Sequence, residues 1–133
     1  MRCFVDTNAW VAWAQADEPG HRRALETLRS VPPDRVVTSD HVIGETFTRL
    51  RTKRGYAAAA RAGAILLDES YVRWESVTPE DFGAAWAMFS KYGDKELSFT
   101  DCTVLVQPER LGIGPIFAFD DDFRKMGRRV IPG

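Results

Sequence analysis

The chain has 133 residues, with 18 basic and 19 acidic side chains that give a formal net charge of −1. This length fits one domain, residues 1–133, and a content of 44% hydrophobic and 11% aromatic residues is typical of a packed core, which excludes a disordered segment. The near-neutral charge excludes a globally basic surface, so any surface that binds a nucleic acid has to be local.

Short apolar runs that alternate with segments of helical spacing predict the secondary structure. In chain order we expect a strand at residues 3–5, helices at 8–15 and 21–29, a strand at 36–37, helices at 41–54 and 56–68, a strand at 71–77, helices beginning at Pro79 and after Ser98, and strands at 116–119 and 130–131. Such alternation predicts an α/β fold with a central, mainly parallel sheet and helices on both faces.

Local signals mark where several of these helices begin and end. Thr78 followed by Pro79 predicts a capped helix start, and Gly55 predicts a helix end. The residues Phe82, Ala85, Trp86 and Phe89 then have the spacing of a helix face that packs into the core. We expect Pro108 to end or kink the helix that follows Ser98.

The two cysteines and the first residues of the chain favour an ordinary intracellular protein. Cys3 and Cys102 could form one bridge, but neither lies in a metal-binding pattern, and Cys102 is expected to fill the core. No apolar leader follows the N-terminus, and no stretch approaches ~20 apolar residues, so we expect no membrane segment and a cytoplasmic location.

Four carboxylates stand out by their positions in the predicted elements: Asp6, Glu45, Asp101 and Asp120. Asp6 and Asp120 end strands, whereas Glu45 and Asp101 lie in the first turns of helices. In parallel sheets, sites form at the carboxyl ends of the strands, so these acids are expected to converge. Two carboxylates ~4 Å apart repel by about 4 kcal/mol at an effective dielectric near 20, which favours a bound cation. An all-oxygen ligand set indicates Mg²⁺, with Mn²⁺ as a substitute.

Each acid also has an ordinary structural explanation. Asp6 could cap the following helix, Glu45 could pair with Arg49 or His41, and Asp101 could simply favour a helix N-terminus. Asp121 and Asp122 are expected to belong to a solvated acidic turn.

Taken together, four segments resemble the motifs of PIN domains in the order of that family. They are Phe4-Val5-Asp6-Thr7-Asn8, Val42-Ile43-Gly44-Glu45, Leu97-Ser98-Phe99-Thr100-Asp101 and Phe117-Ala118-Phe119-Asp120. The resemblance implies a three-layer α/β/α sandwich and a Mg²⁺-dependent endoribonuclease. It assigns metal binding to Asp6 and Asp101, completes the acidic site with Glu45 and Asp120, and gives supporting roles to Thr7, Asn8, Ser98 and Thr100.

The size of the chain resembles that of VapC-like toxins within this family. This implies an RNA substrate (tRNA, rRNA or mRNA), a small DNA-binding antitoxin of the VapB kind, and a homodimer. Three departures from the family pattern are Asp122 at a place where many relatives have His, Pro108, which is expected to shorten its helix, and Gly44, which lowers helix propensity beside Glu45.

Other interpretations stay open at this point. The basic clusters (Arg49, Arg51, Lys53 and Arg54; Arg124, Lys125, Arg128 and Arg129) could bind RNA phosphates or be solvated faces. The four tryptophans favour a core or an interface over base stacking. A non-catalytic RNA-binding module of the same fold would be expected to have lost its acids, and a Mg²⁺-dependent phosphatase would be expected to carry a D-x-D pattern after the first strand, which this chain lacks.

Overall fold

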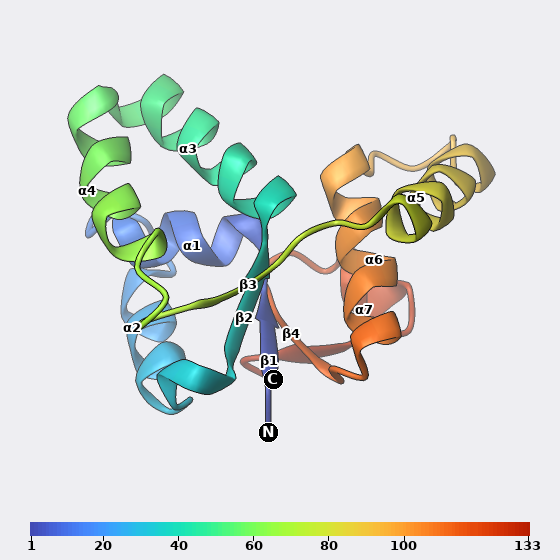
Figure 1. Ribbon diagram of the computed structural model, residues 1–133. Coiled ribbons are helices and arrows are strands. Elements are labelled where there is room, and N and C mark those ends of the chain that lie inside the picture. The colour runs from blue at the N-terminus through green and yellow to red at the C-terminus, as the bar shows by residue number, and fades with distance from the viewer.

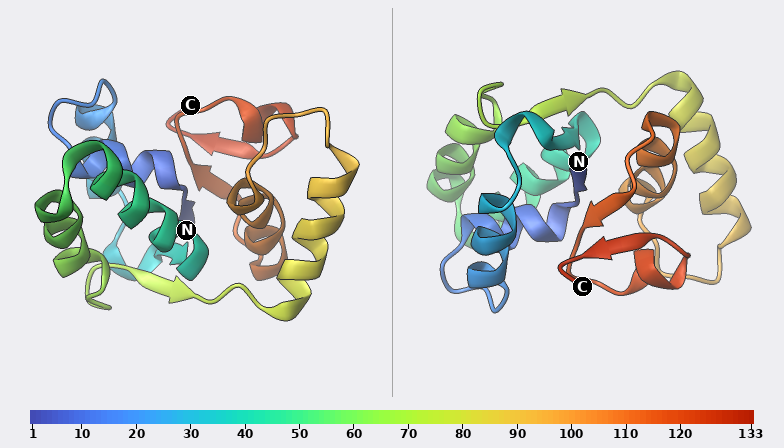
Figure 2. Two further views of the ribbon diagram at one scale, coloured as in Figure 1. Left: turned by 90° about the horizontal axis from the view of Figure 1, so that it is seen from above. Right: turned by 90° about the horizontal axis from the view of Figure 1, so that it is seen from below.

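The computed structural model describes all 133 residues and shows a sheet of five strands between two layers of helices (Figure 1). Helices α1 to α4 cover one face, and α5 to α7 cover the other, as the two further views also show (Figure 2). The strands are β1 (Cys3–Val5), β2 (Val36–Ser39), β3 (Arg73–Glu75), β4 (Pro115–Phe117) and β5 (Arg129–Ile131). The helices are α1 (Thr7–Ala14), α2 (His21–Arg29), the 3₁₀ turn η1 (Pro33–Arg35), α3 (Asp40–Arg54), α4 (Tyr56–Leu66), α5 (Pro79–Lys91), α6 (Phe99–Leu111) and α7 (Asp122–Lys125). The expected α/β/α sandwich is confirmed.

The sheet has the strand order β3-β2-β1-β4-β5, and every neighbouring pair is parallel. Phe4 of the central strand β1 is in register with Val37 of β2 on one side and with Ile116 of β4 on the other. Strands β2 and β3 are added in turn on one side of β1, and β4 and β5 are then added on its other side. The direction of the strand order therefore switches between β1 and β4. Ligands of open parallel sheets bind in the crevice at the carboxyl ends of such a pair.

The hydrophobic core is built around the two central strands of the sheet. All three residues of β1 and all three of β4 are buried, because helices cover both faces of the sheet. Trp10 of α1 is buried against the sheet and donates a hydrogen bond from Nε1 to Thr38 Oγ1 at 3.1 Å. Cys3 and Cys102 are both buried and free, which agrees with core filling for Cys102 and excludes a bridge.

The helix starts that the sequence predicts are confirmed. Ser39 accepts a hydrogen bond from the Val42 N–H at the start of α3, and Thr78 and Ser98 each form a full capping box at the starts of α5 and α6. Gly55 ends α3 with a φ of 91°, a conformation that side-chain-bearing residues rarely adopt. These local signals determine where the loops at the carboxyl edge of the sheet begin and end.

The interpretation of α5 as a core-facing helix was wrong for three of its four residues. Ala85 is buried, but Phe82, Trp86 and Phe89 are 50%, 58% and 38% exposed. The helix packs mainly against α6 at the periphery of the molecule, so only a narrow strip of its surface is covered. Helical spacing identifies an apolar face but does not say what covers it.

Three further expectations about elements need correction. Pro108 neither ends nor shortens its helix, because α6 continues to Leu111 with Pro108 inside its last turn and forgoes only the one hydrogen bond that the missing N–H would donate. The expected strand at residues 71–77 is reduced to Arg73–Glu75 at the edge of the sheet. Asp120 does not end β4 directly but lies in the turn after it. No helix is both long and apolar enough to cross a membrane.

Candidate active site

The four acids predicted from the sequence come together at the carboxyl edge of the sheet. Asp6 follows β1, Glu45 lies in the second turn of α3, Asp101 lies in the first turn of α6, and Asp120 lies in the turn after β4. The negative charges of Asp101, Asp120 and Glu45 all raise the pKa of Asp6, so the four side chains lie within electrostatic range of one another. The crevice between β1 and β4 therefore ends in an acidic site.

Asp6 is the most perturbed group of this site. Burial, followed by the nearby charge of Asp101, raises its pKa from the ordinary 3.8 to about 8. The residue is only 1% exposed, and its Oδ1 atom has no hydrogen-bond partner. Asp6 occupies the N-cap position of α1, but its side chain makes no capping hydrogen bond. The interpretation of Asp6 as an ordinary cap is therefore wrong, and the structure leaves a buried carboxylate oxygen in need of a cation or a proton.

Asp101 is held in place by the capping box of α6. Its Oδ2 accepts a hydrogen bond from the Ser98 N–H at 2.9 Å, and its own N–H donates to Ser98 Oγ at 3.0 Å. Burial raises the pKa of Asp101, the hydrogen bonds from Ser98 oppose this, and the charges of Asp120 and Glu45 add to it. Because Oδ1 takes no part in the box, Asp101 is fixed in orientation and still has an oxygen available.

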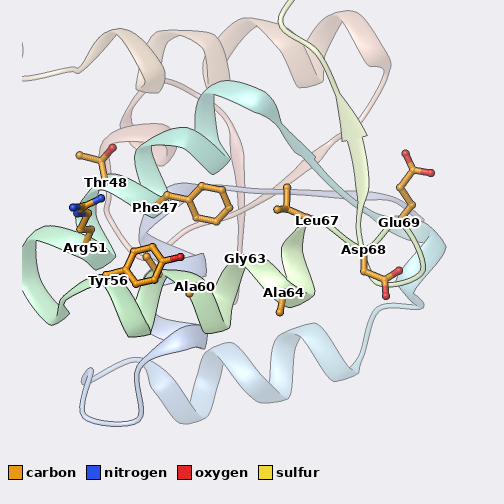
Figure 3. A pocket seen from close by; sticks show the side chains of 11 residues that line it. Phe47, Thr48, Arg51, Tyr56, Ala60, Gly63, Ala64, Leu67, Asp68 and Glu69 are labelled. Atoms are coloured by element: carbon orange, nitrogen blue, oxygen red, sulfur yellow. The ribbon is translucent and has the colours of Figure 1, made fainter.

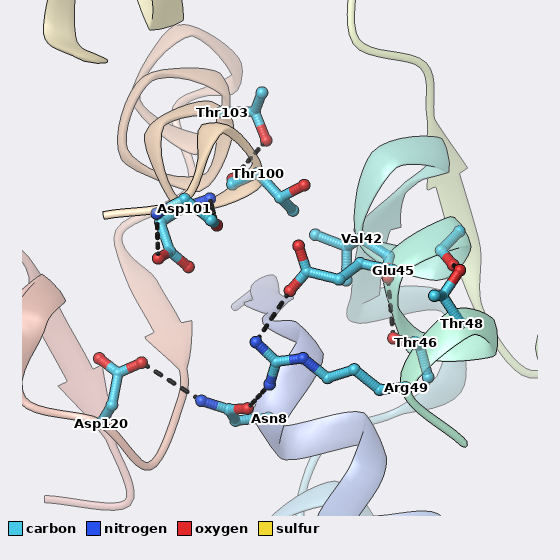
Figure 4. Close-up of polar contacts among 12 residues, drawn as sticks. Asn8, Val42, Glu45, Thr46, Thr48, Arg49, Thr100, Asp101, Thr103 and Asp120 are labelled. Atoms are coloured by element: carbon cyan, nitrogen blue, oxygen red, sulfur yellow. Dashed lines mark hydrogen bonds and ion pairs between the residues drawn. The ribbon is translucent and has the colours of Figure 1, made fainter. Parts of the chain in front are cut away.

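The other two acids are joined by a chain of polar contacts (Figure 4). Asn8 donates from Nδ2 to Asp120 Oδ2 at 3.3 Å, and its Oδ1 accepts a hydrogen bond from Arg49. Arg49 also forms an ion pair with Glu45, with 3.3 Å between Nη2 and Oε1. The second oxygen of Asp120 accepts a hydrogen bond from the Asp122 N–H at 2.9 Å. The pairing of Glu45 with Arg49 is thus confirmed, but it lies inside the acidic site.

Arg49 is a residue of the site that the sequence did not predict. Its spacing of four residues from Glu45 suggested only a surface pair or a contact with RNA. The structure places its guanidinium between Glu45 and Asn8, where it is the one basic side chain that bonds to members of the predicted site (Figure 4).

The remaining predicted residues have smaller roles in the geometry. Ser98 is the N-cap of α6, as expected. Thr7 is buried next to Asp6, and its hydroxyl has no hydrogen-bond partner. Thr100 accepts a hydrogen bond at its main-chain carbonyl from Thr103 Oγ1 at 2.6 Å. Asp121 is exposed and pairs with Arg124, as a solvated turn would.

The donor set of the site fits a hard divalent ion. No three acidic, histidine or cysteine side chains are arranged to enclose an ion by themselves. Mg²⁺, however, is usually held by one or two carboxylates together with waters and substrate phosphates. Asp6, with an unpartnered buried oxygen, and Asp101, with one free oxygen, meet this requirement.

A cavity of about 470 Å³ opens directly beside the acids and includes Asn8, Arg49 and Asp120 in its lining. A larger one of about 1090 Å³ lies between α3 and α4, around Phe47, Tyr56 and Leu67 (Figure 3). No predicted site residue lines the larger cavity, so size alone does not indicate where the chemistry takes place.

Comparisons with known proteins agree with this geometry. A family model described as PIN domain matches residues 3–129. The 23S rRNA-specific endonuclease VapC20 of Mycobacterium tuberculosis is 40% identical over 124 residues, 93% of either chain. The crystal structure of that toxin, which cleaves the sarcin-ricin loop, has a TM-score of 0.87 at 38% identity over 95% of both chains.

More distant structures share the fold alone. VapBC2 from Rickettsia felis, bound to a promoter DNA fragment, has a TM-score of 0.69 at 13% identity and covers 98% of this chain and 97% of its own. FitAcB from Neisseria gonorrhoeae has a TM-score of 0.66 at 12% identity, and the match covers 96% of this chain and 95% of that chain.

Proposed function

This chain belongs to the PIN-domain family, and on that basis we propose that it is a divalent-metal-dependent endoribonuclease that acts as the toxin of a toxin–antitoxin pair. The proposal treats residues 1–133 as a single catalytic domain. The similarity to VapC20, which is named as specific for 23S rRNA, favours a structured ribosomal RNA as the substrate over tRNA or mRNA.

The observation that carries the proposal is the state of Asp6. A fully buried carboxylate with an unpartnered oxygen, surrounded by three further acids, is unfavourable in its charged form unless a cation is bound there. A protein that needed only the fold would gain stability by losing this arrangement. We therefore assign Asp6, Glu45, Asp101 and Asp120 to catalysis.

In this proposal Asp6 and Asp101 hold a Mg²⁺ or Mn²⁺ ion. Such an ion would polarise the scissile phosphate and lower the pKa of the attacking water. Ser98 fixes the orientation of Asp101, and Asn8 fixes that of Asp120. Arg49 orients Glu45 toward the crevice, where Glu45 can accept the proton that the water releases.

We also propose two protein partners, a VapB-like antitoxin and a second copy of the chain. The exposed aromatic residues of α5 support an interface, because apolar groups of this size are seldom left in water without one. The toxin role of VapC20 supports the antitoxin.

Cleavage of RNA by the purified protein, free of any antitoxin, tests the proposed activity. Labelled ribosomal RNA and a broad RNA pool would be incubated with Mg²⁺, Mn²⁺ or EDTA. We expect metal-dependent cuts by the wild type and a loss of at least about 100-fold in Asp101→Asn, the order found when charge-stabilising groups are removed from active sites.

Asp81→Asn is the matched control for this experiment, because Asp81 occupies the same position in a capping box outside the site. It should cleave like the wild type once circular dichroism shows that it is folded. Equal activity of all three proteins would indicate a contaminating nuclease. Binding of RNA without any cleavage under any metal would favour a non-catalytic RNA-binding module instead.

A further inference from the structure

We propose that the cavity beside the acids, here called the flank cavity, binds the backbone phosphate and the base of an RNA nucleotide next to the cleaved bond. The cavity lies between the α1–α2 loop, α3 and the turn after β4, and has a volume of about 470 Å³. This proposal rests on the proposed ribonuclease function and identifies where a nucleotide beside the cleaved bond is bound.

The flank cavity is continuous with the acidic site. Asn8, Arg49 and Asp120 line it, and the same three residues form the polar chain that leads to Glu45 (Figure 4). A strand with its scissile phosphate at the acids can therefore place one adjoining nucleotide at this cavity.

Two cations of the flank cavity have no carboxylate partner. Arg23 of α2 and Lys53 of α3 both line it, and neither forms an ion pair, whereas their neighbours Arg22 and Arg54 pair with Glu26 and with Asp17 and Glu18. Glu18 also lines the cavity, but Arg54 at 3.2 Å compensates its charge. Asp120 is the one acid of the lining without an ion pair, and Arg23 and Lys53 outnumber it. The cavity thus keeps a surplus of positive charge beside the acidic site, which is the pattern expected for binding a phosphate group.

An aromatic ring, that of Phe119, also lines the flank cavity. Phe119 is only half-buried and packs its ring against Gly20, where an added Cβ atom would come within 3.2 Å of the ring. Glycine at this position therefore lets Phe119 stand at the cavity wall. Aromatic faces beside cations are the usual means of holding a single-stranded nucleotide, since any base can stack on them.

Binding of a fluorescein-labelled, single-stranded RNA oligonucleotide in EDTA tests the flank cavity independently of cleavage. The key variant is Arg23→Ala/Lys53→Ala, and both side chains are exposed, so the fold should not suffer. We expect affinity to fall by about tenfold, and the salt dependence to become shallower by about 0.7 in log–log slope for each phosphate group that the variant no longer binds. The conservative variant Arg23→Lys/Lys53→Arg should restore both quantities.

The matched control is Lys125→Ala/Arg129→Ala, which removes the same charge from two cations of the second basic cluster that also lack carboxylate partners. It should bind within about twofold of the wild type. Equal losses in the two double variants would overturn the proposal, because general electrostatics would then explain them. Loss of affinity for a poly-glutamate peptide without loss for RNA would also overturn it, since the cavity would then bind an acidic protein segment.

The binding and cleavage experiments together distinguish a failure of the cavity assignment from a failure of the proposed nuclease activity. If the wild type cleaves RNA and the flank-cavity variant binds and cleaves it equally well, the cavity assignment is wrong and the nuclease stands. If the variant loses RNA binding but the wild type never cleaves, the nuclease is wrong, and the cavity is an RNA-binding site without a cleaved bond beside it.

Discussion

Asp101 and Asp81 show how one local motif can have two roles. Each is the third residue of a helix and closes a capping box, with Ser98 in one case and Thr78 in the other. Hydrogen bonds from Arg110, with Nε 2.6 Å from Oδ1, lower the pKa of Asp81. Burial and the neighbouring acids raise the pKa of Asp101. The first carboxylate is satisfied by its surroundings, and the second is not.

This difference predicts opposite effects of the same substitution on stability. In EDTA, Asp81→Asn should lower the free energy of unfolding by about 2 kcal/mol, because it breaks a partly buried ion pair and leaves Arg110 without its partner. Asp101→Asn keeps an oxygen for the Ser98 N–H and relieves repulsion, so the same free energy should stay constant or rise by up to about 1 kcal/mol. Urea unfolding of the three proteins measures both values, and an equal loss in the two variants would contradict the assignment of Asp101.

Among the elements, α5 is the helix that is least explained by the fold alone. Its residues Phe82 and Phe89 pack against Phe99 of α6 in tilted and edge-to-face arrangements, at ring-centroid distances of 4.7 and 5.9 Å. Trp86 stacks on Phe89 at 5.8 Å. The rings form one continuous aromatic face beside the start of the Asp101 helix. An interface at this face would include Phe99, which lies two residues before Asp101 in α6.

If this aromatic face forms the homodimer, charge on it should separate the subunits. Phe82→Lys/Trp86→Lys should be monomeric at concentrations where the wild type is dimeric, and should keep the wild-type circular dichroism spectrum, because both residues are half exposed. Light scattering coupled to size exclusion gives the mass of each. Ala60→Lys/Ala64→Lys, on exposed positions of α4, is the control that adds the same charge elsewhere. A wild type that is monomeric by itself would contradict the homodimer.

Across the molecule as a whole, folding brings the acids together, so stability, pH and metal are linked. The pKa of Asp6 is about 8 in the folded chain, against an ordinary value of 3.8. Between these two values the folded chain holds a proton that the unfolded chain has lost. The free energy of unfolding therefore falls as the pH rises through this window and levels off above about pH 8.

In EDTA we expect this fall to amount to a few kcal/mol between about pH 5 and pH 8, the order of magnitude for one buried carboxyl group. Asp6→Asn should have a flatter profile, since it has no proton to lose. Mg²⁺ should stabilise the wild type more at about pH 8 than at about pH 6, because protons compete for the same oxygens. Chemical unfolding at several pH values in this range gives the free energy of unfolding of the wild type in EDTA, the wild type in Mg²⁺ and Asp6→Asn. If this free energy depended on pH equally in the wild type and in Asp6→Asn, the role of Asp6 would be contradicted.

Local sequence is enough to predict that the strands exist, though not where each one ends, and to predict the helix starts. An apolar run such as Phe4-Val5 needs burial whatever its neighbours, and Ser98 caps a helix through atoms three residues away. Parallel strands carry the residues that follow them to a common edge of the sheet. This accounts for Asp6, Glu45 and Asp120, which come after β1, β2 and β4. Asp101 lies on α6, which follows another helix, so its arrival at the same edge depends on how α6 packs.

What each of these groups meets at that edge depends on the tertiary fold. The exposure of Trp86, the contact of Arg49 with Asn8 and the unpaired state of Arg23 involve segments distant in the chain. The same holds for the opposite pKa shifts of Asp81 and Asp101, whose local sequences are alike. Burial and charge pairing act through space, so spacing along the chain predicts which side chains reach the site but not which of them are left unsatisfied.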